Sequence, residues 1–238
     1  MTPSELASKI DHTLLRPDAT EEDIKQLCQE AFSYQFYSVC VNPYWVRICK
    51  QKLKGSPVGV CSVVGFPLGA NISDIKTTEA EFALIDGADE IDMVINVGAL
   101  KSGRIDIVSE EISRVRDSSR SVLKVIIETA CLTKGEIILA CNLAKSAGVD
   151  FIKTSTGFYK GPCDYDFLTL ARDVELIRST VGPEMGIKAS GGINMYQIAL
   201  VMLDAGATRL GCSASVDIIN TYKKAQAYKP KEFHEQSR

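Results

Sequence analysis

The sequence contains little of the material from which metal sites and nucleic-acid surfaces are built. It has two histidines in 238 residues and a net charge of −3, and lysines and arginines form no dense cluster. Two histidines leave little for a zinc site, and nucleic-acid interfaces concentrate positive charge. We therefore expect no metal and no nucleic-acid partner. We interpret the lysines near the C-terminus (Lys223, Lys224, Lys229 and Lys231) as a solvated helix end and tail.

Membrane spans and disulfide or zinc motifs are also missing. No segment approaches the ~18 consecutive apolar residues of a spanning helix, and the N-terminus lacks an apolar core of signal-peptide length. The eight cysteines show no C-x-x-C spacing and stand mostly in apolar patterns, which favours buried, reduced thiols. We expect a cytoplasmic protein without membrane contact.

Strand and helix patterns alternate along the whole chain. Extended segments are expected at 9–14, 38–41, 58–64, 90–96, 123–129, 151–158, 186–190 and 209–213. Helices are expected between these segments. Capping boxes at Thr20–Asp23 and Thr133–Glu136 start two of them, and a glycine ends several helices just before a strand. Units of about thirty residues are typical of strand–helix repeats.

This regular alternation predicts the fold. No linker or composition break divides the chain, and no G-x-G-x-x-G follows the first strand, which weakens an open, dinucleotide-binding sheet. We predict an α/β protein with a single (β/α)8 TIM barrel, its parallel strands inside an outer ring of helices. One domain would span 1–238, with the barrel at about 9–219 and a C-terminal helix and tail at 220–238.

Charged residues fall on one face of several predicted strands. Period-two alternation places Ile91, Met93 and Ile95 opposite Asp92, and Ile187 opposite Lys188. If the apolar faces pack on the helices, the barrel interior gathers Asp11, Asp92, Lys124, Glu128, Lys153 and Lys188. A set of ion pairs without chemistry remains an alternative, but burying so many charges is costly even when they pair. A functional site is the favoured interpretation.

Lysines close together inside a protein suggest amine chemistry. A lysine becomes a nucleophile when its pKa falls from about 10.4 towards neutrality, which requires about 4 kcal/mol of bias against the charged form. A second ammonium roughly 5 Å away supplies on the order of 3 kcal/mol at an effective dielectric near 20. Lys153 and Lys188 are expected on neighbouring strands, so one can perturb the other.

Glycine-rich turns follow the last strands. Ser190-Gly-Gly-Ile-Asn194 and Gly211-Cys-Ser-Ala-Ser215 stand where TIM barrels often bind phosphate, and Gly157 follows the sixth strand. Backbone N–H groups at such turns can approach an anion. The combination indicates a phosphorylated substrate.

Several motifs together resemble one family. Asp11-His-Thr-Leu-Leu, Gly65-Phe-Pro-Leu-Gly, Lys124-Val-Ile-Ile-Glu-Thr, Phe151-Ile-Lys-Thr-Ser-Thr-Gly-Phe and Lys188-Ala-Ser-Gly-Gly are similar to those of the deoxyribose-phosphate aldolases. The resemblance covers about 9–219. It implies a cofactor-free class I aldolase that reversibly cleaves 2-deoxy-D-ribose 5-phosphate to D-glyceraldehyde 3-phosphate and acetaldehyde. It also implies small-molecule sugar phosphates and aldehydes as the partners, and by analogy a homodimer or higher homo-oligomer.

The resemblance assigns roles to individual positions. Lys153 corresponds to the Schiff-base lysine, Lys188 to the second lysine that favours its neutral form, and Asp92 to the carboxylate that moves protons through a water. The phosphate-binding positions are Gly157, Gly191, Gly192, Gly211 and Ser213. Thr13 and Cys40 correspond to positions beside the sugar. His12 is expected to be structural, facing the helices.

Some positions depart from the family pattern. The segment 158–172 is longer than usual, and Asn194 and Ser215 replace a basic residue and a glycine; Lys160 is a candidate compensating charge. Tyr222 and Tyr228 receive no role. Two alternatives stay open: a class I aldolase or transaldolase for another sugar phosphate, and a catalytically silent barrel that senses a phosphorylated metabolite.

Overall fold

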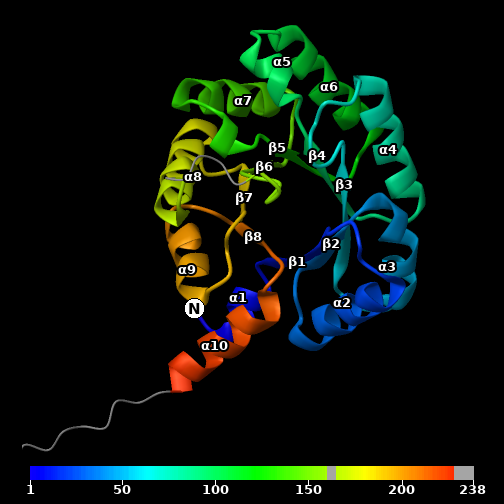
Figure 1. The fold of residues 1–238 in the computed structure, drawn as a ribbon, viewed down its shortest axis with the longest axis vertical. Helices are drawn as coiled ribbons and strands as arrows, with labels where there is room; N and C mark the ends of the chain where they lie inside the picture. The colour runs from blue at the N-terminus through cyan, green and yellow to red at the C-terminus, as the bar shows by residue number, and fades with distance from the viewer. Residues whose placement is uncertain (160–164, 228–238) are drawn as a thin grey trace, which may run out of the picture.

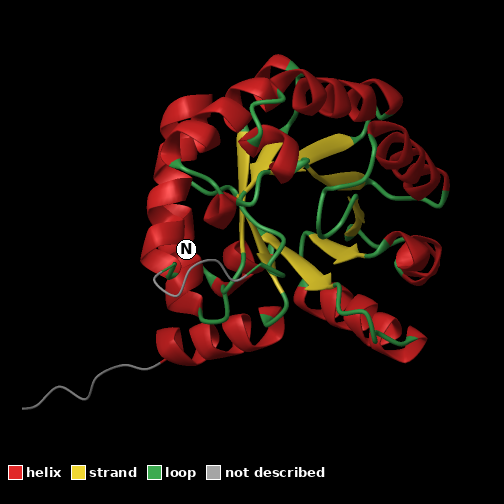
Figure 2. Cartoon of the chain, turned by 45° about the horizontal axis from the view of Figure 1, so that its top comes forward, coloured by secondary structure: helices red, strands yellow, loops and turns green. Residues whose placement is uncertain are grey.

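Eight parallel strands close into a barrel in the order in which they occur along the chain. The computed structural model describes residues 1–159 and 165–227. Figure 2 shows the strands as an inner ring surrounded by helices. The strands are β1 (Ile10–Leu14), β2 (Ser38–Val41), β3 (Gly59–Val64), β4 (Glu90–Val94), β5 (Val122–Ile126), β6 (Phe151–Lys153), β7 (Gly186–Ser190) and β8 (Arg209–Cys212). The predicted TIM barrel is confirmed.

Helices follow the strands and pack around the outside of the barrel (Figure 1). The α-helices are α1 (Pro3–Ala7), α2 (Glu21–Tyr34), α3 (Val46–Lys52), α4 (Ser73–Ile85), α5 (Val97–Lys101), α6 (Ile105–Ser118), α7 (Lys134–Ser146), α8 (Phe167–Val181), α9 (Tyr196–Asp204) and α10 (Ser215–Ala227). Two 3-10 helices, η1 (Pro43–Trp45) and η2 (Thr129–Cys131), complete the described elements. Within the described part of the chain, no helix is both long and apolar enough to cross a membrane.

Local sequence explains where the main helices begin. Thr20 and Thr133 each accept a hydrogen bond from the backbone three residues on, and Asp23 and Glu136 return one, so both predicted capping boxes form. The amphipathic faces of these helices pack on the barrel. The apolar strand residues Ile91, Met93 and Ile95 lie in this helix–barrel core, as the alternation predicts.

The prediction was wrong at the fifth and sixth strands. β5 ends at Ile126, and Glu128 adopts φ 55°, so period-two alternation no longer sets its direction. Glu128 instead accepts hydrogen bonds from the backbone N–H and the hydroxyl of Thr156. β6 has only three residues and ends at Lys153 itself. The short helices α1 and α5 were not predicted.

The helix α10 contacts the first residues of the chain. The Tyr222 hydroxyl donates to the Met1 carbonyl at 2.7 Å, and α10 packs against α1. Tyr222 is therefore part of the packing of the terminal helices. Tyr228 lies outside the described residues.

Candidate active site

The strand register brings the predicted charges together. Lys153 on β6 pairs directly with Lys188 on β7, and Asp92 on β4 pairs with Lys124 on β5. All four side chains are buried inside the barrel. Of the predicted cluster of three lysines and three acids, five members come together: Asp11, Asp92, Lys124, Lys153 and Lys188. Glu128 bonds Thr156 instead.

Asp92 lies at the centre of this cluster. Its Oδ2 accepts hydrogen bonds from Lys153 Nζ and Lys188 Nζ, both at 2.8 Å, and its Oδ1 accepts one from Lys124 Nζ at 2.8 Å. The Cys61 thiol donates to the same Oδ1 at 3.1 Å. Since Lys153 and Lys188 share one oxygen, Asp92 holds the two amines close to each other.

Two charged residues that we did not predict extend the cluster towards the amino ends of the strands. Glu90 lies 2.6 Å from Lys124 Nζ, and Arg209 bonds Asp11 at 2.9 Å and approaches Glu90 at 3.4 Å. Asp11 in turn lies 2.5 Å from Lys188 Nζ. Glu90 stands two residues before Asp92, and Arg209 two before Gly211, so the same alternation could have found both. We call the connected side chains the interior network: Asp11, Glu90, Asp92, Lys124, Lys153, Lys188 and Arg209.

The network fixes the charge of most of its members. Burial lowers the pKa of Lys188 and Lys124, but neighbouring carboxylates outweigh burial and raise both pKa values well above the ordinary range. Burial raises the pKa of Asp92, but Lys124, Lys153 and Lys188 outweigh it and hold this pKa well below its usual value. Lys124 and Lys188 are therefore ammonium groups, and Asp92 is a carboxylate.

A cavity of about 540 Å³ opens above the network, at the carboxyl ends of the strands. Lys153 reaches its lining, whereas Lys188 and Asp92 are fully buried beneath it. Most residues proposed for substrate contact share this lining, together with Arg16 and Asn194: Thr13, Gly157, Gly191, Gly192, Gly211 and Ser213. The structure thus brings the predicted amine and the predicted phosphate positions to one cavity.

Glycine is required at two of these positions for different reasons. Gly191 has φ +93°, and a Cβ there would lie 3.0 Å from Ser155 Oγ. A Cβ on Gly211 would lie 3.0 Å from Lys188 Cε and 3.1 Å from Ser190 Cβ. Gly211 therefore makes room for the Lys188 side chain as well as lining the cavity.

Other predicted positions lie elsewhere. Cys40 is fully buried and contacts Asp92 Oδ2 at 3.8 Å, outside the cavity lining. Ser215 is buried against His12 at 3.0 Å, and His12 also bonds Glu30 of α2 at 2.9 Å, so His12 faces the helices as expected. Lys160 lies outside the described residues. Arg16, in the loop after β1, was missed because nothing in its local pattern points to the cavity.

One group of described residues has metal-ligand chemistry. Ligand atoms of Cys40, Cys61 and Asp92 lie within 4.8 Å of one another, all buried. Lys124 Nζ is 3.4 Å from Cys61 Sγ, and three ammonium or amine nitrogens already surround Asp92. This positive surrounding opposes a further cation.

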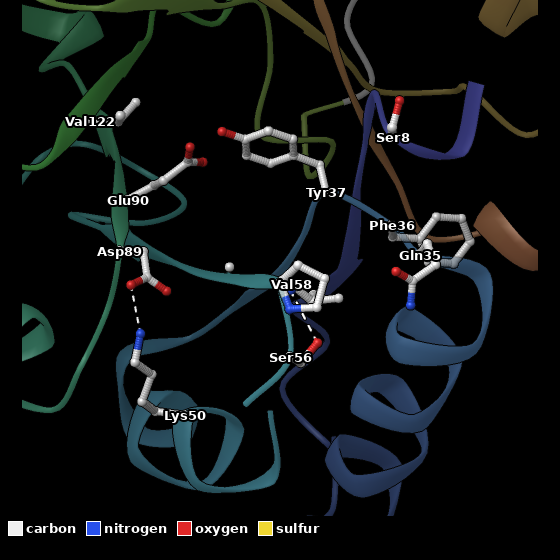
Figure 3. A pocket seen from close by; sticks show the side chains of 12 residues that line it. Ser8, Gln35, Phe36, Tyr37, Lys50, Ser56, Val58, Asp89, Glu90 and Val122 are labelled. Carbon is white, nitrogen blue, oxygen red and sulfur yellow. Dashed lines mark hydrogen bonds and ion pairs between the residues drawn. The ribbon is translucent and has the colours of Figure 1, made fainter. Parts of the chain in front are cut away.

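A second cavity, of about 640 Å³, lies at the amino ends of the strands. Figure 3 shows its lining, which includes Tyr37, Glu90 and the ion pair between Lys50 and Asp89. It contains none of the predicted catalytic or phosphate-binding residues. Chemistry in TIM barrels belongs to the opposite end, where Lys153 lies.

A lysine cluster that opens onto a glycine-lined cavity at the carboxyl ends of a TIM barrel is typical of class I aldolases, which work through a lysine amine. Comparison with known proteins agrees. The family described as DeoC/LacD family aldolase matches residues 6–218. The chain belongs to this family, and the resemblance inferred from the motifs is confirmed.

Individual relatives are similar over nearly their whole length. The chain is 52% identical to the deoxyribose-phosphate aldolase of Caldicellulosiruptor saccharolyticus, over 92% of this chain and 99% of that protein. It is 52% identical to that of Thermococcus gammatolerans, over 95% and 100%. The tetrameric deoxyribose phosphate aldolase structure from Aeropyrum pernix superposes with a TM-score of 0.83 at 34% identity, covering 94% of this chain and 93% of that one.

Proposed function

We propose that this protein is a class I aldolase that reversibly cleaves 2-deoxy-D-ribose 5-phosphate to D-glyceraldehyde 3-phosphate and acetaldehyde. The single observation that carries the proposal is the position of Lys153: it belongs to the buried network and also reaches the cavity. Relatives 52% identical to this chain carry the name of this activity.

Lys153 is proposed as the nucleophile. Its neutral amine adds to the C1 aldehyde of the open-chain sugar, and loss of water from the carbinolamine gives an iminium. The iminium accepts the electron pair of the C2–C3 bond as that bond breaks and the C3 hydroxyl loses its proton. D-Glyceraldehyde 3-phosphate leaves, and C1 and C2 remain on Lys153 as an enamine. Protonation at C2 and hydrolysis release acetaldehyde and the amine.

Asp92 and Lys188 are proposed to assist the Lys153 amine. Lys188 remains an ammonium beside Lys153, which disfavours a second positive charge there. Asp92 Oδ2 contacts both nitrogens at 2.8 Å, so it can direct the amine and pass protons through a water. Lys124, Lys153 and Lys188 outweigh burial and hold the pKa of Asp92 well below its usual range, so Asp92 is ionised before the reaction begins.

The phosphate is proposed to bind among Gly157, Gly191, Gly192, Gly211 and Ser213, which line the same cavity as Lys153. Arg16 offers a positive charge there, and it is oriented by Asp18 at 2.8 Å and Asp23 at 2.6 Å. Arg16 can therefore compensate for the uncharged Asn194. Thr13, in the same lining, is proposed to contact the sugar, and Cys40 to support Asp92 from below.

The proposal is tested by product analysis. The protein is incubated with 2-deoxyribose 5-phosphate, ribose 5-phosphate or unphosphorylated deoxyribose, and acetaldehyde is followed through a coupled dehydrogenase. We expect acetaldehyde from the first sugar and far less from unphosphorylated deoxyribose. Cleavage of another sugar phosphate without acetaldehyde would favour the alternative aldolase. Binding without any cleavage would favour the silent barrel.

We also propose that the protein forms a homo-oligomer in the cytoplasm. Ile75, Phe82 and Ile85 lie on one face of α4 and are more than half exposed, and Leu68 and Ile72 extend this apolar surface. The Aeropyrum pernix relative is described as tetrameric. Phe82→Glu should lower the mass measured by light scattering if α4 forms the interface.

The cytoplasmic location is proposed from the cysteines. The seven cysteines of the described residues are free thiols, which favours a reducing compartment.

A further inference from the structure

We propose that Arg209 and Glu90, at the amino end of the barrel, are positioning residues that set the charge of Lys153. The inference rests on the proposed Schiff-base role of Lys153 and goes beyond it. Neither residue lines the cavity at the carboxyl ends of the strands. They would act through the interior network.

The interior network has one more base than it has acids. Eight ion pairs join the seven side chains of the interior network. Three members are carboxylates, and four are bases. With Lys124, Lys188 and Arg209 charged, the three positive and three negative charges cancel only when Lys153 is neutral. A buried region with uncompensated charge is costly, so the balance favours the nucleophilic form of Lys153.

Two chains of contacts connect Arg209 and Glu90 to Lys153. Arg209 forms an ion pair with Asp11, and Asp11 forms one with Lys188. Lys188 and Lys153 both donate to Asp92 Oδ2. Glu90 holds Lys124, which bonds the other oxygen of Asp92. Both chains therefore end at the carboxylate that contacts Lys153.

Arg209 is held firmly in this position. Its guanidinium carbon lies 3.2 Å from the centre of the Tyr37 ring and 5.4 Å from that of Phe151. Burial lowers the pKa of Arg209, but Asp11 and Glu90 outweigh burial and raise it, so the charge is permanent. Glu90 lines the cavity at the amino ends of the strands (Figure 3).

Several other groups face Lys153. Asp92 comes from β4, Lys124 from β5, Lys188 from β7 and the Cys40 thiol from β2. A hydrogen bond with Cys61 lowers the pKa of Cys40 to about 7, so a Cys40→Ala background removes this titration from the measurement. Arg16, from the loop after β1, also lines the cavity and pairs with Asp18 and Asp23.

The experiment compares Arg209→Met, Glu90→Gln and the double variant. The acidic limb of kcat/KM against pH should move to higher pH in Arg209→Met, because loss of a positive charge favours protonated Lys153. It should move to lower pH in Glu90→Gln. Each shift should be about one pH unit for charges on the order of 10 Å apart at an effective dielectric near 20. The double variant, which restores the balance, should return the limb to its original position.

Two controls separate charge from packing. Arg209→Lys should leave the limb in place, and so should Tyr37→Leu, which removes the ring but no charge. A uniform loss of activity at every pH, with the limb unmoved in both single variants, would overturn the inference. If Arg209→Met does not fold by circular dichroism, Glu90→Gln decides alone, since its shift must be to lower pH.

A readout without substrate separates this inference from the proposed function. Formaldehyde and cyanoborohydride methylate neutral amines, and peptide mass locates the label on Lys153. The pH dependence of this labelling should shift in the same opposite directions in the two variants. Shifted labelling in a protein that cleaves no sugar phosphate would reject the aldolase and retain the charge coupling. Normal cleavage with unshifted labelling would reject the coupling alone.

Discussion

Two buried ionic regions among the described residues differ in composition. Outside the barrel, Lys76 of α4 and Glu111 of α6 form an ion pair at 2.6 Å, with side chains 0% and 1% exposed. Glu111 also accepts a hydrogen bond from the Asn96 backbone, and Lys76 donates to the Val94 carbonyl. This pair has one base for one acid. The interior network has four bases for three acids.

The two regions also differ in the pKa of their lysines. Burial outweighs Glu111 and lowers the pKa of Lys76, and burial likewise outweighs Lys76 and raises the pKa of Glu111. In the interior network, carboxylates outweigh burial at Lys124 and Lys188 and raise their pKa values. Burial of a lysine is therefore not enough to make a site. The interior network differs from the Lys76–Glu111 pair because it has one more base than acids, and because Lys153 reaches a cavity.

Lys153→Met should have the largest effect on catalysis. Without the amine no imine forms, so kcat/KM for 2-deoxyribose 5-phosphate should fall by at least about 10³-fold, or about 4 kcal/mol. The folded structure should persist, because the remaining network then has three positive and three negative charges. Steady-state kinetics and circular dichroism measure the two effects. Activity within about tenfold of the parent would contradict the proposed role.

Lys76→Met should show the opposite pattern. It leaves Glu111 buried without its cation, so the free energy of unfolding should fall by about 3–5 kcal/mol. The kcat/KM of the folded fraction should stay within about twofold of the parent. Urea unfolding and kinetics at low temperature measure these quantities. The paired variant Lys76→Met/Glu111→Leu should regain most of the stability, since it leaves no unpaired charge. A large loss of kcat at full stability would mean that this pair also serves the reaction.

Gly211→Ala should have a smaller effect. It tests whether turnover depends on the space that Gly211 leaves for Lys188. The new methyl group would press on Lys188 Cε, so turnover should fall about tenfold, by about 1.4 kcal/mol, for both phosphorylated and unphosphorylated deoxyribose. Gly192→Ala is the comparison variant: its Cβ meets no atom within 4 Å, and its strain at φ +69° acts on the phosphate turn rather than on Lys188. There only the KM of the phosphorylated sugar should rise. Equal effects of both substitutions on KM alone would place Gly211 solely in phosphate binding.

Much of the barrel and of the network could be predicted from the sequence. Strand alternation is a local property, and it correctly placed Asp11, Asp92, Lys124, Lys153 and Lys188 in the interior. Glu90 and Arg209 were missed because charged residues at the first position of a strand are usually solvated.

Tertiary context explains the remaining differences. Glu128 was placed wrongly because β5 ends at Ile126 and the backbone turns to positive φ, which alternation cannot foresee. Arg16 reaches the cavity from a loop whose path depends on the closed barrel. The balance of four bases against three acids emerges only when seven strand positions are brought together in space.

The most direct test of the account is reductive trapping. The protein is incubated with 2-deoxyribose 5-phosphate, borohydride is added, and the modified lysine is located by peptide mass. We predict a two-carbon adduct, an acetaldehyde imine reduced to an ethyl group, or the full sugar adduct, on Lys153. Lys76, Lys124 and Lys188 should remain unmodified. An adduct on one of these three lysines in place of Lys153, or no adduct at all, would contradict the account.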